Sequence, residues 1–83
     1  MRTIAYSKSA LQVLRRMPAN EAKRIVGKIE QYATDPRSQA NNVEALVGSP
    51  YIRLRVGDWR VIMDDQGAVL EVLKVSARGD IYR

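Results

Sequence analysis

The sequence predicts an α+β fold, in which a short N-terminal strand and a helical hairpin pack on one face of an antiparallel, twisted β-sheet. Apolar residues recur with the period of a helix before residue 36 and with the two-residue period of strands after Pro50. Helices followed by a run of strands are typical of α+β domains. The chain has 83 residues, a length that suits one small core, so we expect a single domain over residues 1–83.

The first half of the chain is expected to form one strand and two helices. Residues 3–6 read as a short strand, and Ser7 can cap the helix that follows. Pro18 interrupts this helix, because the residue before a proline avoids the helical region. A second helix is expected over residues 20–33, where the apolar stripe consists of Ala22, Ile25, Val26, Ile29, Tyr32 and Ala33. Two helices joined this closely favour an antiparallel hairpin.

The second half is expected to form a strand meander. Residues 36–50 are polar and irregular, with one turn expected over residues 43–46. Three strands with alternating side chains are expected over residues 51–56, 59–64 and 68–75. The link Gly57-Asp58 has glycine first, which fits a two-residue type II′ hairpin turn. Gln66-Gly67 is a weaker signal for a second two-residue turn.

The Gly57-Asp58 turn predicts an arginine face on the sheet. It places Arg55 opposite Arg60, with Arg53 on the same face. The opposite face, toward the helices, would carry Ile52, Leu54, Val56, Trp59, Val61 and Met63. Directly opposed like charges destabilise a sheet, so water and salt, a carboxylate or a bound anion must offset the repulsion. A two-residue turn at Gln66-Gly67 would set Glu71 opposite Ile62, where it could pair with Arg53 or Arg60.

Composition narrows the class of function. The net charge is +5, and ten arginines stand against four lysines, a balance that favours a polyanion or an acidic partner over plain solubility. The chain has no cysteine, so a disulfide or a zinc–thiolate site is excluded. It has neither a run of about 18 apolar residues nor the apolar core of a signal peptide. We therefore expect a complete, soluble, cytoplasmic protein that does not bind membranes.

Two segments resemble one protein family. The segment SPYIRLRVGDWRVIM, followed after one more strand by VSARGDIYR, resembles the RelE/ParE superfamily of bacterial and archaeal toxins, and its RelE-like branch in particular. The resemblance covers the whole chain and implies a toxin of a type II toxin–antitoxin system. RelE-like members enter the ribosomal A site and cut mRNA, whereas ParE-like members poison DNA gyrase.

The resemblance also implies roles for individual residues. Catalytic roles fall on Arg60, Arg78 and Tyr82, and a substrate-binding role falls on Arg53. Beyond the residues that match the family, we expect Arg55, Tyr51 and Lys74 to bind substrate as well. In RelE-like toxins a basic residue stands at the position of Tyr51, and basic residues or histidine are frequent at those of Ala77 and Gly79.

The residue types limit the reaction to arginine-led chemistry. RNA is cut when its own 2′-hydroxyl attacks the adjacent phosphate, a step that needs a base, charge stabilisation and an acid. The chain has no histidine, so a two-histidine ribonuclease is excluded. Asp64-Asp65 lies at an expected turn and reads as solvated rather than metal-binding. We expect no metal and no cofactor, with Arg60 and Arg78 clamping the phosphate and Tyr82 available as the base.

A second basic set and a partner surface are expected on the helices. The basic residues are Arg15, Arg16, Lys23, Arg24 and Lys28, which either form a solvated face or contact ribosomal RNA phosphates. An acidic or amphipathic, helix-containing antitoxin is the partner that the resemblance implies, in a hetero-oligomeric complex that binds operator DNA through the antitoxin. Its candidate contacts are Val13, Leu14, Met17 and Trp59, each of which also suits the core. The ribosome and mRNA are the other expected partners. The alternatives are a gyrase inhibitor and a weakly active homologue that mainly binds its antitoxin.

Overall fold

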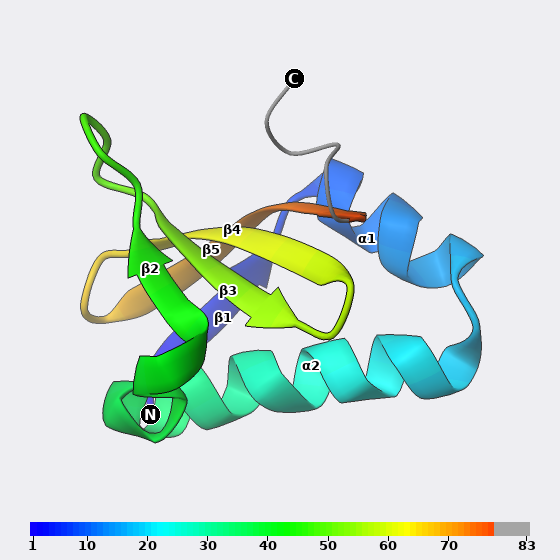
Figure 1. Ribbon diagram of the computed structural model, residues 1–83, viewed down its shortest axis with the longest axis horizontal. Helices are drawn as coiled ribbons and strands as arrows, with labels where there is room; N and C mark the ends of the chain where they lie inside the picture. The colour runs from blue at the N-terminus through cyan, green and yellow to red at the C-terminus, as the bar shows by residue number, and fades with distance from the viewer. Residues whose placement is uncertain (78–83) are drawn as a thin grey trace.

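The computed structural model describes residues 1–77 and, within them, places two helices on one face of a five-stranded sheet (Figure 1). The strand order is β1-β5-β4-β3-β2. β1 (Thr3–Tyr6) runs parallel to β5 (Val69–Ala77), whereas the other neighbouring strands are antiparallel. The predicted α+β fold is confirmed. The sheet is mixed at the β1 edge, because β1 pairs with β5 in the parallel direction.

The two helices begin and end close to the predicted positions. α1 (Lys8–Arg16) is capped by Ser7, whose hydroxyl accepts the Ala10 N–H at 3.0 Å and also donates to the Leu73 carbonyl at 2.7 Å. α2 (Ala19–Thr34) follows Pro18 directly. The residues of α2 that are buried belong to the predicted stripe: Ile25, Ile29, Tyr32 and Ala33. The Ser7 cap therefore fixes both the start of α1 and its position against β5.

The segment after α2 differs from the prediction. A 3-10 helix, η1 (Pro36–Asn42), leads into β2 (Val43–Ala45), which pairs antiparallel with β3. The expected turn over residues 43–46 is therefore wrong. Three residues are too few for their periodicity to identify a strand, and β2 becomes one because the outer edge of β3 offers unpaired backbone groups.

The central hairpin has the predicted register. β3 (Ile52–Val56) and β4 (Trp59–Asp65) pair with Arg55 opposite Arg60 and Val56 opposite Trp59. Gly57 has φ of +58°, as the first central residue of a type II′ turn requires. The face toward the helices carries the predicted apolar residues, of which Leu54, Val56, Val61 and Met63 are buried.

The register between β4 and β5 is shifted from the predicted one. Glu71 lies opposite Asp64, and Lys74 lies opposite Ile62. The Gln66 N–H donates to the Val69 carbonyl at 2.9 Å, and Asp65 lies opposite Leu70, so the two-residue turn is Gly67-Ala68 rather than Gln66-Gly67. A bulge between Ile62 and Met63 changes the register once more. The shift moves Glu71 by two residues along the strand, so it stays on the arginine face but lies farther from the arginines.

The core lies between this sheet and the helices. β5 contributes Leu70, Val72 and Val75, α1 contributes Ala10 and Leu14, and all five residues are buried. Within residues 1–77, neither helix combines the length and the hydropathy that crossing a bilayer requires.

Candidate anion-binding site

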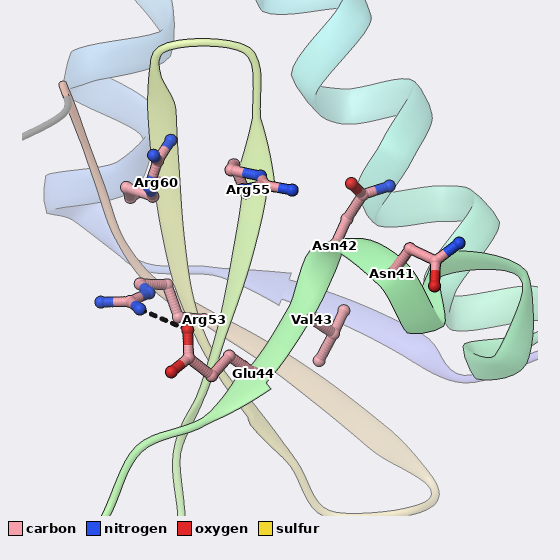
Figure 2. A pocket seen from close by; sticks show the side chains of 7 residues that line it. All are labelled: Asn41, Asn42, Val43, Glu44, Arg53, Arg55 and Arg60. Carbon is pink, nitrogen blue, oxygen red and sulfur yellow. Dashed lines mark hydrogen bonds and ion pairs between the residues drawn. The ribbon is translucent and has the colours of Figure 1, made fainter.

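A hollow of about 150 Å³ lies on the face of the sheet that points away from the helices. Figure 2 shows the hollow between the β3–β4 hairpin and the segment from the end of η1 into β2. Its lining residues are Asn41, Asn42, Val43, Glu44, Arg53, Arg55 and Arg60. The sheet thus brings the three arginines of the predicted face to one concave surface.

Arg55 and Arg60 form the end of the hollow nearest the Gly57 turn. They occupy directly opposed positions on β3 and β4, and Arg55 is exposed. Arg60 donates from Nη1 to the carbonyls of Gly57 and Trp59, each at 3.0 Å. These two bonds orient the Arg60 guanidinium by backbone groups of its own hairpin.

Arg53 has a carboxylate partner that the sequence did not predict. Its Nη2 lies 2.5 Å from Glu44 Oε2, and the two residues are directly paired across β2 and β3. The Arg53 side chain is 13% exposed and that of Glu44 is 68% exposed. The predicted pairing with Glu71 is wrong, because Glu71 instead accepts a hydrogen bond from Gln66 Nε2 at 2.8 Å. Glu44 was missed because β2 was not recognised as a strand.

The other residues predicted to bind substrate do not line the hollow. Tyr51 is exposed just before β3, where its N–H donates to Ser49 Oγ at 3.0 Å. Lys74 is exposed on β5, opposite Ile62, on the same face of the sheet as Arg60. Arg78 and Tyr82 lie outside the described residues.

The predicted helical basic residues are on the surface, with Lys28 half-buried and the others exposed. Arg24 lies against the Gly57 turn, since a Cβ on Gly57 would be 3.0 Å from Arg24 Nη1. Arg16 borders an apolar groove of about 320 Å³, whose other lining residues are Val13, Met17, Pro18 and Trp59. Three of the four predicted partner contacts therefore meet in one groove, whereas Leu14 is buried in the core.

Asp65 is not the solvated turn residue that we expected. It accepts hydrogen bonds from Arg2 Nε at 2.7 Å, Tyr32 OH at 2.7 Å and the Gly67 N–H at 3.0 Å. Burial by itself would raise the pKa of Asp65, but these three donors outweigh it and lower that pKa. Burial and the hydrogen bond to Asp65 raise the pKa of Tyr32 to about 12. The cluster is structural, since it joins the segment before β1, α2 and the end of β4.

The geometry of the hollow suits a phosphate group. Guanidinium groups bind phosphate oxygens through paired, charge-assisted hydrogen bonds, and two opposed arginines gain most from a shared anion. Within residues 1–77 there is no group of three or more metal-ligating side chains. The described part of the site therefore offers arginines and one carboxylate for chemistry.

Comparison with known proteins agrees with this fold. The complex of archaeal RelE and RelB from Pyrococcus horikoshii has a chain with TM-score 0.78 and 24% identity, over 95% of this chain and 97% of that one. The intact RelBE toxin–antitoxin complex of E. coli has a chain with TM-score 0.71 and 22% identity, over 96% and 99%. YafQ from E. coli has TM-score 0.66 and 18% identity, over 100% of both chains. These likenesses show a shared fold.

A sequence model of a protein family matches nearly the whole chain. Curated protein sequences gave no significant match. The model of the ParE toxin of type II toxin–antitoxin systems, parDE, matches residues 4–82, nearly the whole chain. Together with the shared fold, this match confirms the resemblance to the RelE/ParE superfamily. The protein therefore belongs to the ParE toxin family and is a toxin of a type II toxin–antitoxin system.

Proposed function

We propose that this toxin is a metal-independent endoribonuclease that cuts mRNA in the ribosomal A site, as a single toxin domain over residues 1–83. The observation that supports the proposal is the convergence of Arg53, Arg55 and Arg60 on one hollow. A gyrase-binding surface has no need of such a hollow, whereas cleavage of a phosphodiester needs cations around the phosphate. The ribosome would supply the remaining orientation of the mRNA.

The proposed reaction is attack of the 2′-oxygen on the adjacent phosphorus. The 2′-O–H bond breaks, a bond from the 2′-oxygen to phosphorus forms, and the bond to the 5′-oxygen breaks. Arg60 and Arg78 clamp the non-bridging oxygens, while Arg53 and Arg55 hold the strand. Tyr82 is the proposed acceptor of the 2′-hydroxyl proton, a role that requires arginines close enough to favour its ionised form, as opposite charge does. The leaving 5′-oxygen takes a proton from water. Tyr51 and Lys74 bind the flanking RNA.

Two further partners belong to the proposal. Arg15, Arg16, Lys23, Arg24 and Lys28 would contact ribosomal RNA phosphates, so binding to ribosomes should weaken steeply as salt rises. The cognate antitoxin would lay an acidic, amphipathic helix in the groove beside Arg16, whose charge complements it. The hetero-oligomeric complex would bind operator DNA through the antitoxin. Ribosomes and mRNA lie in the cytoplasm, so a cytoplasmic location is part of the proposal.

The test maps RNA ends after incubation of the toxin with purified, programmed ribosomes. Wild-type protein should produce cuts in the A-site codon, and Arg60→Ala should slow them by about 10²- to 10³-fold, the usual effect of removing one group that stabilises transition-state charge. Arg37→Ala is the matched control, because it removes an arginine that is 95% exposed and does not line the hollow. Equal cleavage by the Arg60→Ala and wild-type proteins would reject the mechanism.

The match to the ParE model favours a second candidate, inhibition of DNA gyrase. A gyrase inhibitor would arrest growth with DNA damage, would leave ribosomal mRNA intact and would not require Arg60. Expression with and without the product of the neighbouring gene separates the candidates. Translation loss supports the nuclease, and DNA damage supports the gyrase inhibitor. Absence of any growth phenotype supports a homologue that mainly binds its antitoxin.

A further inference from the structure

A carboxylate lies inside the hollow that is proposed to bind phosphate. Within residues 1–77, Glu44 is the only acidic residue that lines it. A negative charge at this place opposes the approach of any anion, whatever the anion is. The Glu44 carboxylate therefore does not help to attract anions, and its position beside three arginines must serve another purpose.

The two members of the Glu44–Arg53 pair differ in their access to solvent. The Arg53 side chain is 13% exposed, so it has lost most of its contact with water, and a counter-ion stabilises a charge in such a place. Glu44 is 68% exposed, so its carboxylate can turn into water without a comparable loss. Glu44 also lies on β2, a three-residue strand at the edge of the sheet in the described chain. The carboxylate is thus the member of the pair that can leave.

An incoming phosphate can interact with more arginines in the hollow than the Glu44 carboxylate does. Figure 2 shows the Glu44 carboxylate turned to Arg53, with Arg55 and Arg60 farther along the hairpin. A phosphate between the strands could accept from Arg53 and also reduce the repulsion between Arg55 and Arg60. Exchange of Glu44 for phosphate would keep the charge of Arg53 compensated throughout.

We propose that Glu44 is an internal counter-ion of Arg53, which the substrate phosphate displaces. Glu44 holds Arg53 in place while the hollow is empty and lowers the affinity for RNA until a phosphate engages the neighbouring arginines as well. The identity of the anion as RNA rests on the proposed function, whereas the displacement itself does not.

The main variant is Glu44→Gln, which keeps the size and hydrogen-bonding reach of the side chain but removes its charge. The matched control is Glu30→Gln, which changes the net charge equally from an exposed position on α2 that does not line the hollow. Binding of a labelled single-stranded RNA oligonucleotide is measured by fluorescence anisotropy across a salt series. Glu44→Gln should bind about tenfold more tightly at low salt. Its plot of log affinity against log salt should keep nearly the wild-type slope, because a phosphate contacts Arg53 in both proteins once Glu44 is displaced.

A second measurement uses inorganic pyrophosphate and thermal unfolding. Glu44→Gln removes the carboxylate that competes with phosphate for Arg53, so pyrophosphate should raise the Tm of this variant more than that of the wild-type or Glu30→Gln protein. In an Arg53→Ala background, Glu44→Gln should change RNA affinity much less, because the pair no longer exists.

Several outcomes overturn the proposal. Unchanged or weaker RNA binding by Glu44→Gln, relative to Glu30→Gln, would do so, as would an equal pyrophosphate response in all three proteins. Mapping of RNA ends separates this proposal from the nuclease function. If Glu44→Gln gains affinity while wild-type protein cuts no mRNA, the counter-ion role stands and the nuclease function fails. If wild-type protein cuts mRNA while Glu44→Gln gains no affinity, the counter-ion role alone fails.

Discussion

At the residue scale, Asp65 joins parts of the chain that are far apart in sequence. Its carboxylate accepts from Arg2 on the segment before β1, from Tyr32 near the end of α2 and from the Gly67 N–H in the turn before β5. Its lowered pKa means that folding favours the ionised form. Such a group contributes stability above its unfolded pKa, and the contribution is lost as pH falls through the folded value.

We expect Asp65→Asn to lower the free energy of unfolding at pH 7 by about 1–3 kcal/mol, because it weakens the half-buried ion pair with Arg2 and the half-buried hydrogen bond from Tyr32. The loss should shrink as pH falls below about 4, where the unfolded carboxyl becomes protonated. Urea unfolding from pH 7 to pH 3 measures this. Asp64→Asn is the control, since the Asp64 carboxylate accepts a hydrogen bond from the neighbouring Gln66 side chain at 3.0 Å and lies outside this cluster. Parallel pH curves for the wild-type and Asp65→Asn proteins would contradict the role.

At the scale of elements, α2 contains a glycine that its surroundings do not require. A Cβ built on Gly27 has no heavy atom within 4 Å, and its φ is that of an ordinary helix residue rather than positive. Gly57, in the hairpin turn, differs on both counts, because its φ is +58° and Arg24 lies against it. Two glycines in neighbouring elements thus have opposite roles for stability.

Gly27→Ala should stabilise the protein by about 1 kcal/mol, because alanine restricts the unfolded chain and meets no steric conflict in α2. Thermal or urea unfolding measures the change. Gly57→Ala is the comparison and should destabilise, since alanine is strained at positive φ. A loss of stability in Gly27→Ala, with folding otherwise intact, would contradict the prediction. It would mean that the added Cβ of residue 27 disturbs the packing of α2.

At the scale of the whole molecule, two surfaces with different chemistry lie on opposite sides of the sheet. The arginine hollow is on the outer face, and the apolar groove beside Arg16 lies on the helical side, where Trp59 faces the core. A partner in the groove and a phosphate in the hollow therefore occupy separate places. Neutralisation by an antitoxin and cutting of mRNA should be separable by mutation.

Val13→Asp should test that separation. The aspartate places a negative charge in the groove, which would repel an acidic helix. It would also make the groove less apolar and so weaken contact with the apolar face of that helix. We expect antitoxin binding to weaken by at least about tenfold, while mRNA cutting on ribosomes stays near the wild-type level. Titration with the purified product of the neighbouring gene measures the first, and mapping of RNA ends measures the second. Undiminished neutralisation of Val13→Asp would place the antitoxin elsewhere.

The sequence by itself determined the features that depend on near neighbours. Ser7 caps α1, Pro18 separates the helices, and the Gly57 turn sets the register that opposes Arg55 to Arg60. A cap, a proline and a two-residue turn each act over a few residues, so their effects can be predicted without the rest of the fold. The arginine face was predictable for this reason.

Only the tertiary structure decided the contacts between distant segments. It paired β1 with β5, turned residues 43–45 into an edge strand, and brought Glu44 to Arg53 and Asp65 to Arg2. The pattern of neighbouring residues in the sequence does not predict these pairings. Each one depends on which backbone edge or charged group is left unpaired after the other elements have packed. Register depends equally on which residues form the turn, and a turn that lies one residue later was enough to move Glu71 away from the arginines.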